Sequence, residues 1–145
     1  MLVAVAGRLG MRLRSEDTVA RFGGDEFTVL LQNVGGPSGA TEAADRILED
    51  LREPFLLEGR EHHVTASIGI ALSTLAEEDP TPILLCADEA MYMAKQRGGA
   101  CYALQVASLP GVGSPRLAVL GSRRPERRGT RDRRPPRTKA DVPKS

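Results

Sequence analysis

The sequence predicts an α+β fold in which an antiparallel sheet carries flanking helices. Apolar residues alternate along residues 62–72, which is the pattern of a strand. Two longer segments, 39–53 and 80–97, carry apolar residues at helical spacing. Two short apolar runs are separated by glycines at 23–24, which indicates a hairpin. We expect the helices to pack on one face of the sheet.

The chain opens with residues 2–13, whose apolar side chains fall on one helical face and whose arginines lie away from it. Residues 18–21 and 27–32 are the expected arms of the hairpin. Residues 33–39 are rich in glycine, which predicts a loop. The first third of the chain is therefore expected to be a helix followed by a strand pair.

The middle of the chain predicts one helix and one or two strands. Ser38 is placed to cap a helix over residues 39–53, which Pro54 ends. The short apolar run 55–57 is a candidate strand. Residues 62–72 give the clearest strand of the sequence, with its apolar side chains on one face: Val64, Ala66, Ile68, Ile70 and Leu72.

The last helix is expected to open at residues 79–82, with Asp79 or Thr81 as its cap and proline in its first turn. Two glycines at 98–99 end it, and residues 100–105 form a final short strand. A sheet built from these elements requires one more strand at its centre. No segment before residue 18 supplies that strand.

Charge divides the chain near residue 105. Residues 1–104 hold 9 Lys and Arg against 16 Asp and Glu, and residues 105–145 hold 11 against 3. The second part also contains six of the ten prolines, so we expect residues 1–104 to form one domain and residues 105–145 a basic, Pro/Arg-rich disordered tail. A basic tail without interleaved aromatic residues predicts no specific nucleic acid partner.

The composition narrows the class of protein further. No apolar run approaches the ~20 residues that cross a bilayer, and residues 1–14 lack the features of a secretory signal, so we expect a cytoplasmic protein. Cys86 and Cys101 are expected to be reduced thiols. Adjacent histidines on a strand point to opposite faces, so His62 and His63 are interpreted as solvated residues rather than metal ligands.

The residues most suggestive of chemistry lie in the hairpin turn, residues 21–27, Arg-Phe-Gly-Gly-Asp-Glu-Phe. Glycine adopts positive φ without steric cost and leaves the backbone bare. Adjacent carboxylates at Asp25 and Glu26 can hold a hard cation against a phosphate that approaches this backbone. The alternative interpretation is a plain turn with two solvated acids at its tip.

Residues 14–27, Arg-Ser-Glu-Asp-Thr-Val-Ala-Arg-Phe-Gly-Gly-Asp-Glu-Phe, closely resemble the signature of GGDEF domains, the diguanylate cyclases of bacterial signalling. Residues 64–71 resemble the central strand of that family, and residues 87–95 resemble its last helix. The resemblance extends over residues 1–104, in order and with family-like spacing. It implies a fold similar to nucleotidyl cyclases and to the palm of polymerases.

The resemblance also implies a reaction. Two GTP molecules condense to cyclic di-GMP with loss of two pyrophosphates, in bacterial second-messenger signal transduction. Each 3′-hydroxyl attacks the α-phosphate of the other nucleotide. Because two domains face each other with one GTP on each, a homodimer is implied.

The family's functional residues have counterparts in this sequence. Asp25 and Glu26 match the acids that hold the metal, Mg²⁺ or Mn²⁺, and serve the reaction centre. Gly23 and Gly24 match the glycines that let phosphates approach the backbone. Lys95 matches the lysine that binds the triphosphate and stabilises developing charge.

A second site is implied by the Arg-x-x-Asp pattern five residues before the glycine pair. Arg14 and Asp17 match the inhibitory site of the family, where the product cyclic di-GMP binds and arrests the enzyme. A guanidinium suits a phosphate or a guanine edge, and a carboxylate accepts hydrogen bonds from guanine N–H groups.

Two departures from the family pattern bear on activity. The family carries an Asp-rich strand and a Phe-Lys-x-x-Asn-Asp segment upstream of the first helix matched here, and these are not among the 145 residues. Gly99 stands where the family has a phosphate-binding arginine, and Arg97 lies about 200° away around a helix. We therefore expect impaired cyclase activity. The alternatives left open are a non-catalytic cyclic di-GMP receptor and a truncated gene model.

Overall fold

The computed structural model describes residues 1–73 and 80–106, together with the backbone of residues 117–123. It has three helices, α1 (Leu2–Gly10), α2 (Pro37–Arg52) and α3 (Thr81–Gln96), in this part of the chain. The strands are β1 (Thr18–Gly23), β2 (Glu26–Gln32), β3 (Phe55–Leu57), β4 (Arg60–His62), β5 (Ser67–Ser73), β6 (Tyr102–Val106) and β7 (Leu117–Arg123). The expected α+β class is confirmed.

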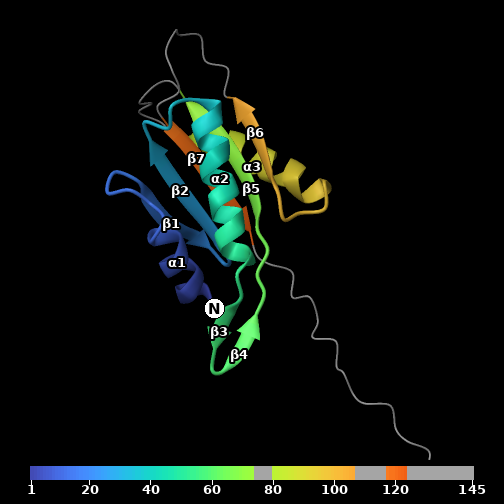
Figure 1. Ribbon diagram of the computed structural model, residues 1–145. Helices are drawn as coiled ribbons and strands as arrows, with labels where there is room; N and C mark the ends of the chain where they lie inside the picture. Colours follow the sequence, from blue (N-terminus) through green and yellow to red (C-terminus); the bar gives the residue numbers. More distant parts are fainter. Residues whose placement is uncertain (74–79, 107–116, 124–145) are drawn as a thin grey trace, which may run out of the picture.

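The main sheet has five strands in the order β1-β2-β7-β5-β6, and β3 and β4 form a separate two-stranded ribbon (Figure 1). Its ladders are antiparallel except between β5 and β6, which run parallel. A parallel pair needs a crossover connection, and α3 is that connection. The expectation of a wholly antiparallel sheet is wrong at this edge.

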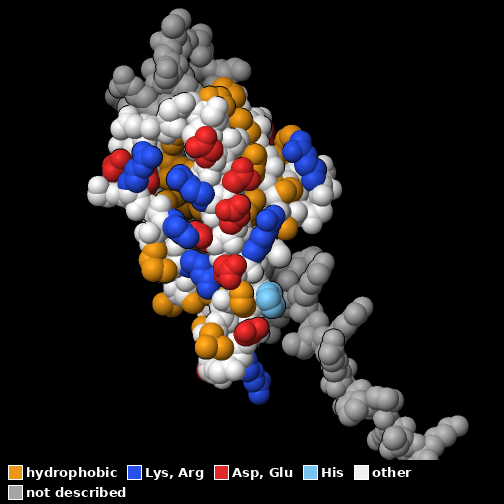
Figure 2. All heavy atoms as spheres, in the orientation of Figure 1, with side chains coloured by type: hydrophobic (Ala, Val, Ile, Leu, Met, Phe, Trp, Pro, Cys, Tyr) orange, Lys and Arg blue, Asp and Glu red, His pale blue; other side chains and the backbone are white. Residues whose placement is uncertain are grey.

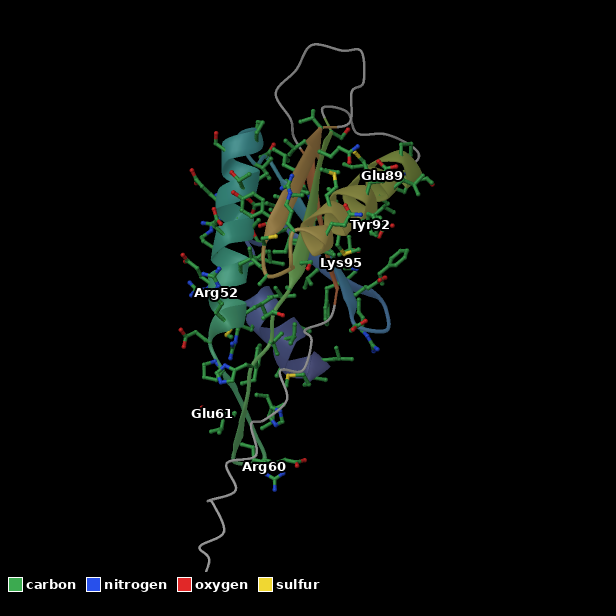
Figure 3. The ribbon with its side chains drawn as sticks, turned by 90° about the vertical axis from the view of Figure 1, so that its right-hand side faces the viewer. Arg52, Arg60, Glu61, Glu89, Tyr92 and Lys95 are labelled. Atoms are coloured by element: carbon green, nitrogen blue, oxygen red, sulfur yellow. The ribbon has the colours of Figure 1, made fainter. Side chains whose placement is uncertain are left out.

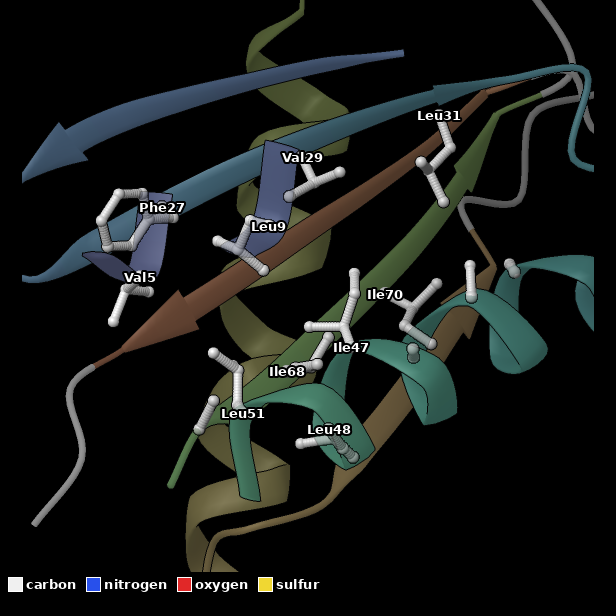
Figure 4. Packing of buried hydrophobic residues seen from close by; sticks show 14 of the residues in the cluster. Val5, Leu9, Phe27, Val29, Leu31, Ile47, Leu48, Leu51, Ile68 and Ile70 are labelled. Carbon is white, nitrogen blue, oxygen red and sulfur yellow. The ribbon is translucent and has the colours of Figure 1, made fainter. Parts of the chain in front are cut away.

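Helices cover both faces of the sheet, not one as expected. Side chains of α1 and α2 pack with β2 and β5 in the larger core cluster, which Figure 4 shows. On the other face, Ile83 and Ala87 of α3 pack against Ala71 of β5. As a result every residue of β5 is buried, including the positions that the alternating pattern assigned to a polar face.

The centre of the sheet is occupied by β7, which lies between β2 and β5. Residues 117–123 belong to the segment expected to be a disordered tail, so that expectation is wrong for this stretch. Averaging over a Pro- and Arg-rich segment obscured a short apolar run, Leu117 to Leu120, which can form a strand. The position that the sequence left without a strand is thus filled from beyond residue 106.

Several boundaries differ from the expected ones. Instead of one strand over residues 62–72, β4 and β5 are separate. Helix α2 begins after Gly36, which has φ 92°, and has no side-chain cap bond from Ser38. Helix α3 begins at Thr81 and its N-cap is Pro80, so Thr81 is the first residue of the helix and not its cap. Asp79 lies outside the described residues.

The charge on the α2 face limits where a polyanion could bind. Over α2, basic and acidic side chains alternate in the view of Figure 2, so this face has no patch of one sign.

Both cysteines are free and both histidines are exposed, as expected. No helix in residues 1–73 or 80–106 is long and apolar enough to cross a membrane.

Candidate active site

The hairpin turn is fixed by a side chain that the sequence did not single out. Gly24 has φ 53°, and a shift of register interrupts the β1–β2 ladder between Arg21 and Gly23. The Arg21 guanidinium donates two hydrogen bonds to the Gly24 carbonyl oxygen, from Nε at 2.9 Å and from Nη2 at 2.6 Å. A shallow apolar hollow of about 160 Å³ between α1 and β1 also has Arg21 in its wall. Arg21 therefore shapes the turn that presents the two acids.

Asp25 lies in this turn and Glu26 directly follows it, and both acids are half-buried. Glu26 is the first residue of β2. Phe27 and the alternate residues after it are buried on the α1–α2 face, whereas Leu30 packs toward α3. Because strand side chains alternate between faces, Glu26 lies on the α3 face with Leu30. Asp25 precedes it within the turn.

Lys95 lies in the last turn of α3, whose direction is fixed by close packing on β5. A Cβ on Gly69 would meet the backbone of α3 at Ala87 and Met91, so this glycine lets the helix approach β5. At the C-terminal end of α3, a Cβ on Gly99 would lie 3.2 Å from Ser67 Oγ, at the start of β5. Figure 3 shows Glu89, Tyr92 and Lys95 along α3.

The register of the central strands brings the two regions to one end of the sheet. Phe27 pairs with Ser122 of β7, and Ser122 pairs with Ile68 of β5. Two strand spacings separate β2 from β5, so the backbones of Phe27 and Ile68 lie about 10 Å apart. Glu26 and the end of α3 that carries Lys95 thus share one face and one end of the sheet.

The acids present suit a metal ion that is bound together with a phosphate. Among the described residues, no group of three or more His, Cys, Asp or Glu is placed to hold an ion. Mg²⁺ commonly takes one or two carboxylates and fills its remaining positions with water and substrate phosphates. Asp25 and Glu26 match that donor set, and they do not form a complete metal site without a ligand.

The structure brings Arg14 and Asp17 together in the turn before β1. The Asp17 carboxylate accepts hydrogen bonds from the backbone N–H of Arg14 at 3.0 Å and of Gln32 at 3.1 Å. Asp17 therefore ties this turn to the end of β2, a structural role that the sequence did not indicate. The Arg14 side chain is exposed.

The backbone at the end of α3 explains why glycine stands at position 99, where the family resemblance implies an arginine. Gly98, Gly99 and Ala100 have φ values of 102°, 71° and 53°, all in the left-handed region. Glycine adopts this conformation at least cost, whereas a larger residue is strained in it. Arg97 is the C-cap of α3 and is exposed.

A comparison with known protein families shows which family the chain belongs to. A family model described as "Diguanylate cyclase, GGDEF domain" matches residues 1–101. This chain belongs to the GGDEF domain family. All the candidate site residues, from Arg14 to Lys95, lie within the matched region of the GGDEF domain.

Curated relatives of this GGDEF domain carry different names. It is 33% identical over 120 residues to the bifunctional diguanylate cyclase/cyclic di-GMP phosphodiesterase MucR of Pseudomonas aeruginosa, covering 83% of this chain and 17% of MucR. It is 40% identical over 98 residues to the diguanylate cyclase TpbB of the same species, covering 67% of this chain and 22% of TpbB. It is 46% identical over 87 residues to the cyclic di-GMP phosphodiesterase PdeR of Escherichia coli, covering 59% and 13%. The chain thus spans less than a quarter of each relative.

Two solved structures resemble the fold. One is a GGDEF-only form of TpbB from P. aeruginosa, with a TM-score of 0.65 and 38% identity, covering 74% of this chain and 62% of that chain. The other is an EAL/GGDEF domain protein from M. capsulatus, with a TM-score of 0.63 and 39% identity, covering 74% and 68%.

Proposed function

We propose that this GGDEF domain carries a diguanylate cyclase-type site, which binds GTP together with Mg²⁺ or Mn²⁺ and belongs to the condensation of two GTP to cyclic di-GMP. The observation that carries the proposal is the common location of Glu26 and Lys95, on one face and at one end of the sheet. A carboxylate for a metal and an ammonium for phosphate, at one end of one face of the sheet, suit a metal–triphosphate ligand. Such a substrate places the domain in the cytoplasm.

Each residue has a chemical task in this proposal. Asp25 and Glu26 hold the metal, which neutralises phosphate charge and polarises the phosphate that is attacked. Gly23 and Gly24 let the phosphates approach the backbone of the turn. Lys95 binds the triphosphate and stabilises the charge that develops on the leaving pyrophosphate. Because each domain binds one GTP and the product contains two, two copies of the domain must face each other.

Two features of the chain support impaired turnover. The central strand β7 contains no Asp or Glu, so it offers no further metal carboxylate at the position where the family resemblance implies one. Gly99 offers no guanidinium to the phosphates. We expect GTP to bind only with metal, and its condensation to be slow in a polypeptide of this sequence.

The proposal is tested by titration calorimetry of GTP against the full chain, once with Mg²⁺ and once with EDTA. Binding is expected only with Mg²⁺. The pair Asp25→Asn with Glu26→Gln should weaken it at least about tenfold, a loss of ~1.4 kcal/mol. The matched control, Asp45→Asn with Glu49→Gln on the exposed face of α2, should bind as the wild type does.

Two outcomes would count against it. GTP that binds equally well with EDTA would remove the role of the metal, and unchanged affinity in the Asp25 and Glu26 variant would remove the role of these acids. A turnover assay with GTP and Mg²⁺ tests the impairment separately. Rapid formation of cyclic di-GMP would support the site and overturn the expectation of slow condensation.

The second candidate function is a non-catalytic cyclic di-GMP receptor. It is favoured by the exposed Arg14 beside an Asp17 carboxylate held in place by two backbone donors. Calorimetry with cyclic di-GMP on the wild type and on Arg14→Ala tests it. Binding that is lost in Arg14→Ala, in a protein that does not bind GTP, would favour the receptor over the cyclase.

A further inference from the structure

Two polar side chains are buried in the part of the chain that the structure describes, and both belong to β5. Ser67 is the first residue of the strand and Ser73 is the last. Ala71 packs against α3, and both serines are an even number of positions from it, so they lie on the same α3 face of the sheet. They differ in which end of that face they occupy.

The hydroxyl of Ser67 lies beside the end of α3. A Cβ on Gly99 would lie 3.2 Å from Ser67 Oγ. The Gly99 N–H donates a hydrogen bond to the carbonyl oxygen of Ala94 at 3.1 Å, and Ala94 directly precedes Lys95. Ser67 is therefore a neighbour of the last turn of α3, through contacts that involve only β5 and the end of this helix.

This hydroxyl is a hydrogen-bond donor that the fold does not use. Within the described residues the Ser67 hydroxyl makes no hydrogen bond, whereas Ser73 has a partner. Ser67 is 8% exposed, and Ser73 is 2% exposed. Burying a hydroxyl without a partner costs free energy, and most buried polar groups are paired. A ligand at the end of α3 can supply the partner that the protein does not.

Gly99 controls access to the Ser67 hydroxyl. The family resemblance implies a phosphate-binding arginine at position 99, and the stem of that side chain would begin at a Cβ 3.2 Å from Ser67 Oγ. A side chain there would crowd the hydroxyl, and glycine leaves it open. The departure that removes a guanidinium therefore uncovers another hydrogen-bond donor at the same place.

We propose that Ser67 donates a hydrogen bond to a phosphate oxygen of the nucleotide, in place of the arginine that this chain lacks at Gly99. The inference rests on the proposed function, because the metal and Lys95 bring the triphosphate to this end of α3. A hydrogen bond to a charged oxygen is stronger than one between neutral groups. A hydroxyl adds no positive charge, so Ser67 contributes to binding and does not replace the charge of a guanidinium.

Calorimetry of GTP with Mg²⁺ on the full chain tests the role of Ser67. In Ser67→Ala the affinity should fall about tenfold, or ~1.4 kcal/mol. Ser73→Ala is the matched control, because it removes a buried hydroxyl from the same face of the same strand, and it should bind GTP as the wild type does. Urea denaturation of both variants measures their stability. Unchanged GTP affinity in Ser67→Ala, or equal losses in the two variants, would overturn the proposal.

Inorganic tripolyphosphate with Mg²⁺ is the second probe, because it carries the phosphates without guanine or ribose. Ser67→Ala should weaken its binding by the same factor as the binding of GTP. A loss of affinity for GTP without a loss for tripolyphosphate would overturn the assignment of Ser67 to the phosphates.

A double-mutant cycle tests whether Gly99 uncovers the hydroxyl. Gly99→Ala should weaken GTP binding in the wild type, because its Cβ crowds Ser67 Oγ. In the Ser67→Ala background it should weaken binding no further, because no hydroxyl remains to be covered. Alanine is also strained at the φ of 71°. Equal losses in the two backgrounds would assign the effect to this strain and overturn the link between Gly99 and Ser67.

Failure of this inference and failure of the proposed function give different results. A wild type that does not bind GTP with Mg²⁺, or binds it without need of Asp25 and Glu26, would overturn both. A wild type that binds GTP through these two acids, together with a Ser67→Ala variant of equal affinity, would overturn only the contact with Ser67.

Discussion

The two regions that carry the candidate site are built differently. Strand β1 is exposed over most of its length and forms an edge of the sheet, and its turn to β2 has open space around the glycines. Strand β5 is fully buried between helices on both faces. The acids thus lie on a lightly packed hairpin, and the lysine lies on a helix seated on the most buried strand.

This difference separates two kinds of glycine. In the β5–α3 region, Gly69 has no room for a side chain because the backbone of α3 lies against it. In the hairpin, Gly24 has room but a left-handed backbone, and Gly23 has neither constraint. Replacing each by alanine measures steric packing in one region and backbone conformation in the other.

Gly69→Ala should have the largest effect. The added Cβ would lie within 2.8 Å of Met91 Cβ and still closer to backbone atoms of α3, so the helix must move. We expect a loss of about 3 kcal/mol in the free energy of unfolding, the upper part of the range for overpacking. Urea denaturation followed by circular dichroism measures it.

Gly7→Ala is the control for that experiment. Gly7 is inside α1 and has nothing within 4 Å of an added Cβ. Alanine there should raise stability by about 0.5–1 kcal/mol, because it favours the helix. If Gly69→Ala were as harmless as Gly7→Ala, the close packing of α3 on β5 would be contradicted.

Gly24→Ala should have an intermediate effect. Its φ of 53° costs a non-glycine residue about 1–2 kcal/mol, and no neighbouring atom adds to this. Gly23→Ala, with open space and no positive φ, should stay within about 0.5 kcal/mol of the wild type. Equal losses at the two positions in urea denaturation would show that the backbone conformation of the turn is not what distinguishes them.

The same contrast explains what could be predicted from sequence. The hairpin and its glycines were predicted because turn residues act locally, through their own φ and ψ. The helices were predicted because their apolar spacing is a local pattern too. The burial of both faces of β5 was not predicted. It depends on α3, which covers the second face, and the alternation of apolar residues within 62–72 contains no information about that helix.

Two further features were not predicted from the sequence, because they too depend on contacts between distant or irregular parts of the chain. Arg21 has an effect on the site through the Gly24 carbonyl, a contact that is set by the irregular ladder rather than by any motif. Strand β7 pairs with residues 44 to 95 positions earlier in the chain, from Ser73↔Leu117 to Phe27↔Ser122, and nothing near residue 117 signals these partners. Non-local pairing and second-face packing are the parts of a fold that a single sequence reports least.

Arg21→Lys tests whether the guanidinium of Arg21 shapes the hairpin turn. Lysine keeps the charge but cannot donate from two nitrogens to the Gly24 carbonyl in the geometry of a guanidinium. Stability should fall by less than about 1 kcal/mol, because the contact is exposed. The affinity for GTP with Mg²⁺ should fall more, by about tenfold, or ~1.4 kcal/mol. Calorimetry and denaturation on one sample separate the two effects, and equal losses in both would make Arg21 merely structural.

The smallest effect is expected in α3, at the half-buried Cys86, which packs against the cluster that joins α3 to β5. Burial raises the pKa of this thiol, and the nearby negative charge of Glu89 raises it further. The thiolate is the reactive form, so alkylation of Cys86 should lag behind that of a free cysteine near pH 8 and increase at higher pH. Glu89→Gln should lower the pKa slightly and speed alkylation at a given pH, because burial, the larger cause, is unchanged.

The rate of iodoacetamide labelling at the Cys86 peptide, followed by mass spectrometry across pH, measures this. Glu42→Gln on the exposed face of α2 is the matched charge control and should leave the pH profile of Cys86 unchanged. A Glu89→Gln profile that coincides with the wild type would assign the raised pKa to burial alone. A profile matching a free cysteine would instead mean that the thiol is more accessible than the packing of α3 on β5 allows, and would weaken the contrast between a rigid helix and a lightly packed hairpin.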